Sequence, residues 1–198
     1  MNIPSTLNRF FLLLAIMSGT VWAGDIRGTV SAKIEKYQKD AVVYLDRMEG
    51  RTFEAPGEPV HMDQRRMAFV PRVLPVLVGT RVDFLNSDDV LHNVFSPDKV
   101  AGRFNLGTYP QGEVRSKVFE IPGSAVILCN VHPEMEAYVV VVETPYFAVT
   151  DTDGSFVIHD VPGGTYTLKV WSERYEGEPR EVEVPPSGSV EALFHLEN

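Results

Sequence analysis

Four side chains of types that bind soft metal ions stand out in this sequence. Cys129, His132 and Met135 lie three residues apart in one run, and His92 lies 37 residues upstream of the cysteine. Cys129 is the only cysteine in 198 residues, so it has no disulfide partner within the chain. One thiolate, two imidazoles and a thioether form the donor set of electron-transfer copper sites. The sequence therefore predicts one copper ion held by His92, Cys129, His132 and Met135.

The first residues have the pattern of an export signal. Arg9 precedes a short apolar run at 10–17, and small residues follow at 21–23. The run is too short to span a bilayer, and no cysteine at the predicted cleavage point could carry a lipid. We expect residues 1–23 to be a cleaved signal peptide, and the mature chain to be a periplasmic protein with no transmembrane segment.

Composition narrows the function classes. Removal of residues 1–23 takes away Arg9 and no acidic residue, so 17 basic and 27 acidic residues remain, which argues against a nucleic-acid partner. The sequence contains no Ser-His-Asp pattern, paired catalytic carboxylates or phosphate-binding loop. All four predicted metal positions are filled by protein ligands, which leaves none for a substrate. We therefore expect a protein that is not an enzyme.

The sequence around these ligands has mostly the patterns of β-strands, so strands are expected to position them. Short alternating or β-branched runs are separated by Gly and Pro, and no run after the signal keeps a 3.6-residue apolar period. An all-β fold is expected, with strands at 26–30, 41–45, 73–78, 81–85, 126–128 and 138–142, and then at 147–150, 155–159, 165–171, 180–184 and 190–196.

The segment 145–198 resembles the carboxypeptidase regulatory-like, prealbumin-like β-sandwich modules. The resemblance depends on the run 150–156 with its Asp153-Gly154 turn, and on the run 161–166 with its Pro-Gly-Gly turn. In that family a Gly-x-Val strand and an Ala-x-Val-x-Leu strand precede this hairpin. Here such strands lie about a hundred residues upstream, within 25–52. We infer that 25–52 and 145–198 form one small sandwich interrupted by the metal module; alternatively, 25–52 adds strands to that module.

The segment 58–143 resembles the cupredoxins, and the amicyanin and plastocyanin types among them. Val78 to Asn86 and Leu91 to Val94 match the family's early strands and its first ligand, and Cys-x-x-His-x-x-Met matches the short amicyanin-type ligand loop. The resemblance implies a Greek-key β-sandwich with one type 1 (blue) copper ion. It also implies that Asn93 ties the histidine loop to the cysteine loop, and that Pro133 stiffens the ligand cage.

Three functions are compatible with these patterns. The first is a periplasmic carrier of single electrons, a monomer whose partner is a redox protein such as a c-type cytochrome or a periplasmic dehydrogenase. The second is copper storage, delivery or sensing. The third is a structural or adhesive β-sandwich protein in which copper is auxiliary.

Other chemically capable side chains have weaker patterns. We expect His61, His159 and His195 to be surface or strand residues, because no ligand types surround them. Met62 and Met67 alternate with Phe69 and are expected in a strand core. Asp88 and Asp89 are expected in a solvated turn, and residues 102–112 are expected to form a loop.

Overall fold

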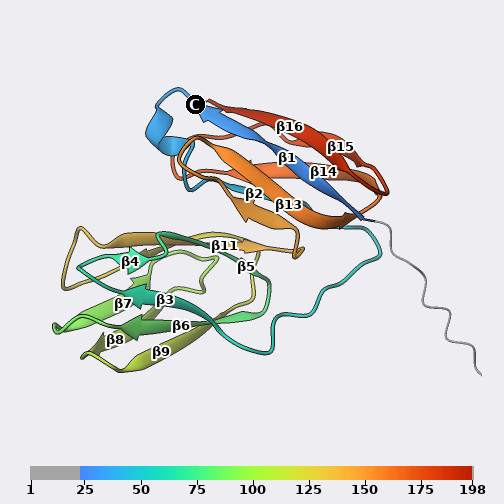
Figure 1. The fold of residues 1–198 in the computed structure, drawn as a ribbon. Helices are drawn as coiled ribbons and strands as arrows, with labels where there is room; N and C mark the ends of the chain where they lie inside the picture. Colours follow the sequence, from blue (N-terminus) through green and yellow to red (C-terminus); the bar gives the residue numbers. More distant parts are fainter. Residues whose placement is uncertain (1–22, 198) are drawn as a thin grey trace, which may run out of the picture.

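The computed structural model describes residues 23–197, whose regular secondary structure is β-strand apart from one short 3-10 helix (Figure 1). The predicted all-β class is confirmed. The predicted signal peptide lies outside the described residues except for Ala23, where the first strand begins. Within 23–197, no helix has the length and apolar character needed to cross a membrane. One short 3-10 helix, η1 (Glu35–Tyr37), follows the first strand.

Seven strands from the two ends of the chain form one β-sandwich, which we call the terminal sandwich. Its first sheet has the order β13-β1-β16, and its second has the order β12-β2-β14-β15. The strands are β1 (Ala23–Ala32), β2 (Val42–Leu45), β12 (Phe147–Val149), β13 (Ser155–Pro162), β14 (Gly164–Trp171), β15 (Arg180–Val184) and β16 (Ser189–Leu196).

The remaining nine strands form a second sandwich, which we call the inserted sandwich. Its sheets have the orders β5-β11-β10-β7-β8 and β4-β3-β6-β9. The strands are β3 (Val60–Gln64), β4 (Phe69–Val70), β5 (Val73–Leu77), β6 (Thr80–Asn86), β7 (His92–Ser96), β8 (Phe104–Tyr109), β9 (Val114–Phe119), β10 (Gly123–Leu128) and β11 (Glu136–Val142).

Strands distant in sequence pair closely in the terminal sandwich. β1 lies antiparallel to β13 and parallel to β16, with Val30 opposite Phe194. β2 lies between β12 and β14. Thus β1 and β2 take both of their ladder partners from residues 147–196, although nearly a hundred residues separate β2 from β12.

Each sandwich buries its own apolar core, and a third cluster joins them. Ile26, Leu45 and Leu168 are fully buried in the terminal core, whereas Phe84 and Ile127 are fully buried in the inserted core. Between the two lie buried valines with flanking aromatic side chains: Val42, Val73, Val140, Val142, Tyr44, Tyr138, Phe147 and Trp171. Figure 1 accordingly shows the two sandwiches stacked, with β5 and β11 beside the terminal sandwich.

Two local expectations were wrong. Residues 102–112 are not only a loop, because β8 (Phe104–Tyr109) pairs with β7 in this stretch. Its side chains are mostly exposed or half-buried, so the apolar alternation that marks a strand is weak there.

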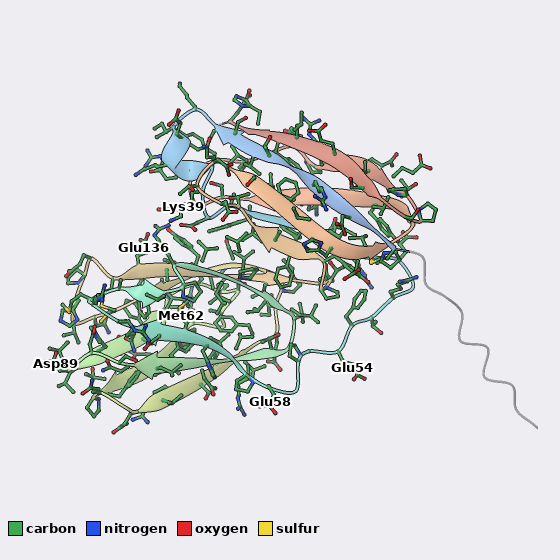
Figure 2. The ribbon with its side chains drawn as sticks, in the orientation of Figure 1. Lys39, Glu54, Glu58, Met62, Asp89 and Glu136 are labelled. Carbon is green, nitrogen blue, oxygen red and sulfur yellow. The ribbon has the colours of Figure 1, made fainter. Side chains whose placement is uncertain are left out.

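Met67 does not lie in a strand core. It sits in the β3–β4 turn with φ +60° and is 38% exposed, whereas Met62 is fully buried, as expected (Figure 2).

Candidate metal centre

Neighbouring strands bring His92 and Cys129 together. His92 is the first residue of β7, and Cys129 directly follows β10. β7 and β10 are adjacent antiparallel strands, with Phe95 opposite Leu128. This register places the start of one strand beside the end of the other. His132 and Met135 then lie in the turn that leads from β10 to β11, and the Met135 N–H donates to the His132 carbonyl at 3.0 Å.

Three of the four predicted ligands converge on one point. One donor atom each from His92, Cys129 and His132 lies within 4.8 Å of the other two. The two imidazoles face each other with their Nδ1 atoms 3.0 Å apart, and the His132 Nδ1 lies 3.9 Å from the Cys129 sulfur. His92 is fully buried and Cys129 nearly so, while His132 is half-buried. The cluster is thus open to solvent mainly along His132.

Met135 is also close to this centre in the fold. Its side chain is 1% exposed and belongs to the same buried cluster as Cys129. Pro133 is exposed beside His132. The arrangement therefore gathers a thiol and two imidazoles directly, with a thioether in the surrounding core. Their role as metal ligands stays a prediction.

Asn93 connects the two ligand-bearing segments through both its backbone and its side chain. Its backbone N–H donates to the Cys129 sulfur at 3.4 Å, and its side-chain oxygen accepts from the Asn130 N–H at 3.3 Å. The side-chain nitrogen donates to Asn105 on β8 at 2.8 Å. The buried amide therefore holds three segments in register.

Replacement of Asn93 by alanine is expected to cost about 1–3 kcal/mol of unfolding free energy, because its side chain makes two partly buried hydrogen bonds, to Asn105 and to the Asn130 N–H, that alanine cannot make. Urea unfolding followed by tryptophan fluorescence would measure this loss. Asn105→Ala removes one of the Asn93 contacts and an exposed bond from the Gly107 N–H, and should cost less because water can replace the exposed bond. Equal stability of Asn93→Ala and the native chain would contradict the bridging role.

Asp88 is a site residue that sequence reasoning placed only in a solvated turn. Its carboxylate lies 2.9 Å from the His92 Nε2, and it accepts the backbone N–H groups of Arg66 and Met67 at 2.6 and 2.9 Å. Burial opposes ionisation, but the bonds from Met67, His92 and Arg66 together hold the pKa of Asp88 below its usual value. A carboxylate at Nε2 favours the proton there, which leaves the Nδ1 lone pair directed at His132.

If His92, Cys129 and His132 bind a metal ion, replacement of Asp88 by asparagine is expected to weaken that binding by about 10–100-fold, as loss of a ligand-orienting partner does elsewhere. An amide has one acceptor oxygen, so at least one of the three donors around Asp88 would meet an NH2 group instead. Competition with a chromogenic zinc chelator would measure the change. Asp89→Asn, at the exposed neighbour, is the matched control and should leave the affinity unchanged.

The other histidines lie elsewhere. His61 is exposed on β3; His159 lies 3.3 Å from Asp25; and His195 contacts Ser31 at 2.9 Å and Glu197 at 3.7 Å. None of the three belongs to the cluster of His92, Cys129 and His132. This matches their expected placement as surface or strand residues.

Sequence comparison gives two matches to one kind of protein. Residues 128–194 match the family described as endoplasmic reticulum membrane protein complex subunit 7, β-sandwich domain. A protein of that name from Xenopus tropicalis is 35% identical over 82 residues, which are 40% of this chain and 34% of the relative. The chain therefore spans about a third of the length of the curated relative that it matches.

Structure comparison gives partial superpositions on copper proteins. A reduced mutant of amicyanin, with tyrosine in place of a tryptophan, has a TM-score of 0.41 and 24% identity over 52% of this chain and 99% of its own. A purple cupredoxin from Nitrosopumilus maritimus has a TM-score of 0.38 and 27% sequence identity, and the match covers 41% of this chain and 98% of its own. A copper-containing nitrite reductase from Thermus scotoductus has a TM-score of 0.42 and 27% sequence identity, and the match covers 50% of this chain and 25% of its own. The inserted sandwich itself has two mixed sheets, in which β3 is parallel to β6 and β5 is parallel to β11.

These sequence matches correct several predictions. Both describe a subunit of an endoplasmic reticulum membrane protein complex, and neither describes a copper electron carrier. The predictions of electron transport, a copper cofactor, redox partners such as a cytochrome or dehydrogenase, and a periplasmic location were therefore wrong. A complex subunit is consistent with the expectation that the chain is not an enzyme. The supported description is an all-β chain of two sandwiches, with a segment at 128–194 that matches a complex subunit's β-sandwich domain.

Proposed function

We propose that this chain is a non-enzymatic subunit of a membrane-associated protein complex, with the terminal sandwich as its assembly unit. The observation that carries this proposal is the family match over residues 128–194, which takes in β11 and β12–β15 and most of β16. Four of the seven strands of the terminal sandwich, β12 to β15, lie wholly in that match, and β16 lies mostly in it. The related protein is named as a subunit of such a complex.

The proposal treats the two sandwiches as two domains, one interrupted by the other. The supporting observation is that β1 and β2 pair with strands from 147–196, while residues 60–142 form two sheets of their own. Figure 2 places Asp89, beside the candidate metal centre, at the opposite end of the inserted sandwich from Glu54 and Glu58 in the connecting segment. The metal centre and the connection to the terminal sandwich are thereby separated in space.

Chemical crosslinking of the tagged full chain in membranes of its source cells tests the assembly proposal. Crosslinks to the same protein partners, from residues of the terminal sandwich, are expected in a species much larger than 22.1 kDa. Recovery of the chain solely as an uncrosslinked monomer in the soluble fraction would contradict it. Cys129→Ser is the control, because assembly through the terminal sandwich should not depend on this thiol.

We also propose that His92, Cys129 and His132 bind a divalent metal ion of the zinc class, with Met135 as a weak fourth ligand. The supporting observation is the convergence of one thiol and two imidazoles within 4.8 Å. Thiolate and imidazole are the donors that Zn²⁺ prefers in proteins. Such an ion would tie β7 to the β10–β11 turn, and so would stabilise the end of the inserted sandwich.

Calorimetric titration of metal-free protein with zinc chloride tests this second proposal. One ion per chain is expected, with protons released as the thiol ionises. A Cys129→Ser variant should lose most of this heat. Binding of equal strength in both proteins would place the ion elsewhere.

A further inference from the structure

A groove lies between two strands of the terminal sandwich, β15 and β16, and we call it the edge groove. One cavity in it, of about 430 Å3, is lined by residues 180–182 of β15 and 191–193 of β16. A second cavity, of about 330 Å3, shares Arg180 with the first and extends to Glu197. Figure 1 shows both strands on the side of the terminal sandwich that faces away from the inserted sandwich. None of the lining residues belongs to the cluster that joins the sandwiches, so a partner can reach the groove without separating them.

Both strands lie at the edges of their sheets. Within residues 23–197, β15 has a ladder with β14 and β16 has a ladder with β1, so each strand has one neighbour in its sheet. At the end of β16 the backbone is already paired, because Glu176 and Glu197 exchange N–H to carbonyl hydrogen bonds at 2.9 Å in each direction. Along β16 itself, one edge stays without a neighbouring strand in the described chain. Such an edge can pair with an extended segment of another protein.

The edge groove carries an excess of negative charge. Its lining has five carboxylates and one arginine: Glu176, Glu178, Glu181, Glu191, Glu197 and Arg180. Among the residues that the structure describes, four of these carboxylates have no Lys, Arg or His nitrogen within 4.0 Å, and Glu197 has only His195, at 3.7 Å. Arg180 pairs with none of them and lies 5.7 Å from the centre of the Phe194 ring. The charge of the groove is therefore not compensated within residues 23–197.

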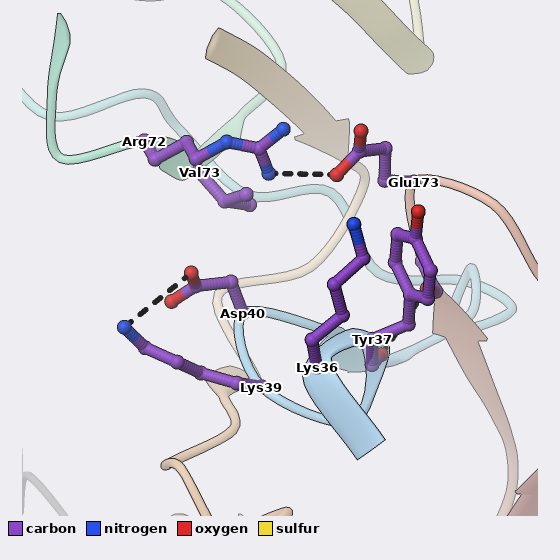
Figure 3. Close-up of a pocket in the computed structure, with 8 residues that line it drawn as sticks. Lys36, Tyr37, Lys39, Asp40, Arg72, Val73 and Glu173 are labelled. Atoms are coloured by element: carbon purple, nitrogen blue, oxygen red, sulfur yellow. Dashed lines mark hydrogen bonds and ion pairs between the residues drawn. The ribbon is translucent and has the colours of Figure 1, made fainter. Parts of the chain in front are cut away.

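The cavity at the junction of the two sandwiches has no such excess. Figure 3 shows two of its ion pairs, Arg72 with Glu173 at 2.7 Å and Lys39 with Asp40 at 3.8 Å. Arg72 also lies 3.5 Å from Glu136. The charged groups there are three cations and three carboxylates: Lys36, Lys39, Arg72, Asp40, Glu136 and Glu173. The junction therefore offers no net charge to a ligand, whereas the edge groove does.

We propose that the edge groove binds a basic, extended segment of a protein partner, which pairs with β16 as an added strand. Side chains on one face of a strand recur at every second residue, so lysine or arginine at alternate positions can reach carboxylates that are spread along the groove. Leu193, which lines the groove and is 51% exposed, offers an apolar contact between these charges.

Other ligands fit the edge groove less well. A second copy of this chain would bring a net charge of -9 and its own Glu191 to an acidic surface. A single metal ion needs ligand atoms that converge. Within residues 23–197, three such atoms from His, Cys, Asp or Glu lie within 4.8 Å of one another only at His92, Cys129 and His132. The carboxylates of the groove are thus too far apart to surround one ion.

This inference rests on the proposed assembly role and names the kind of partner segment, because β15 and most of β16 lie in the family match at 128–194. The two proposals can fail separately. Loss of the edge groove as a binding site would leave crosslinks from other residues of the terminal sandwich standing. Conversely, a chain recovered only as a monomer could still bind a basic peptide in the groove.

Titration of the 15N-labelled full chain with the peptide acetyl-Lys-Thr-Lys-Val-Lys-Thr-Lys-amide tests the proposal. Saturable amide shifts are expected around residues 180–182 and 189–195, and they should weaken in high salt. Hydrogen exchange of β16 amides should slow, because an added strand accepts their N–H groups. Glu191→Gln should weaken binding about fivefold, the upper range of one exposed ion pair. Glu120→Gln, at an exposed glutamate of the inserted sandwich, should bind as the native chain does.

Two control peptides separate strand pairing from attraction between charges. The peptide acetyl-Lys-Pro-Lys-Pro-Lys-Pro-Lys-amide has the same charge, but proline has no N–H to donate, so it should bind more weakly and should slow no β16 amide. The glutamate peptide acetyl-Glu-Thr-Glu-Val-Glu-Thr-Glu-amide should give no saturable shift. Equal binding of the two lysine peptides, an unchanged affinity in Glu191→Gln, or a dimer of the chain that the first peptide dissociates would each overturn the proposal.

Discussion

Zinc is expected to raise the thermal stability of the native chain and to leave that of Cys129→Ser almost unchanged. A ligand that binds only the folded state adds about 2.7 kcal/mol at a hundred times its dissociation constant. Serine keeps an oxygen that can accept the Asn93 N–H, which now donates to the Cys129 sulfur at 3.4 Å. The substitution therefore removes the thiolate while disturbing the metal-free structure little.

Calorimetric scans of metal-free and zinc-loaded protein would measure this difference. His61→Ala is the matched control, because this exposed histidine lies outside the cluster and its loss should leave the zinc-induced shift intact. His92→Ala should behave like Cys129→Ser. A zinc-induced shift of the same size in Cys129→Ser and in the native chain would show that the three side chains are not the ligands.

The sequence predicted which side chains meet at this centre better than it predicted what they do. The strand before Cys129 was predicted at 126–128, whereas the segment that carries His92 was matched through the cupredoxin resemblance. The pairing of β10 with β7 brings the two residues together. The position of Asn93 between the two loops was predicted from the resemblance to the cupredoxins and not from a local pattern. Donor types alone, however, do not specify a biological partner, and the function expected from them was wrong.

Features that depend on distant contacts were missed. Asp88 contacts His92 four residues away, yet its half-buried carboxylate is also held by the N–H groups of Arg66 and Met67, which the β3–β4 turn supplies from 21–22 residues upstream. The ion pair between Arg72 of the inserted sandwich and Glu173 of the terminal sandwich, at 2.7 Å, likewise joins residues that no local pattern links. The edge strand β8 was missed because its exposed face gives little apolar alternation.

In the terminal sandwich, a turn that is recognisable in the sequence also contacts a strand far away along the chain. Asp153-Gly154 was recognised as a tight turn, and the Gly154 N–H does donate to the Asp151 carbonyl at 2.9 Å. The Gly154 carbonyl also accepts the Val30 N–H at 2.9 Å, so the same turn fastens the first strand of the chain to its last third. Because of this contact, a substitution at Gly154 tests directly whether β1 pairs with the C-terminal strands.

Replacement of Gly154 by alanine is expected to destabilise the protein by at least about 2 kcal/mol more than replacement of Gly112, the range of an overpacked site. Both glycines have φ +81°, so alanine at either position would cost the same, about 1–2 kcal/mol, for adopting a left-handed backbone conformation. An added Cβ at Gly112 meets nothing within 4 Å. At Gly154 it would stand 2.0 Å from the Val30 carbonyl oxygen.

The clash is costly because neither side can yield alone. Val30 is nearly fully buried and is held in ladder register against Phe194, so moving its carbonyl away would strain the β1–β16 pairing. Guanidinium unfolding of the two variants, compared at equal slope, would separate the clash from the shared backbone penalty. Equal stability losses would mean that β1 does not approach this turn, and would remove the main support for a sandwich built from both ends of the chain.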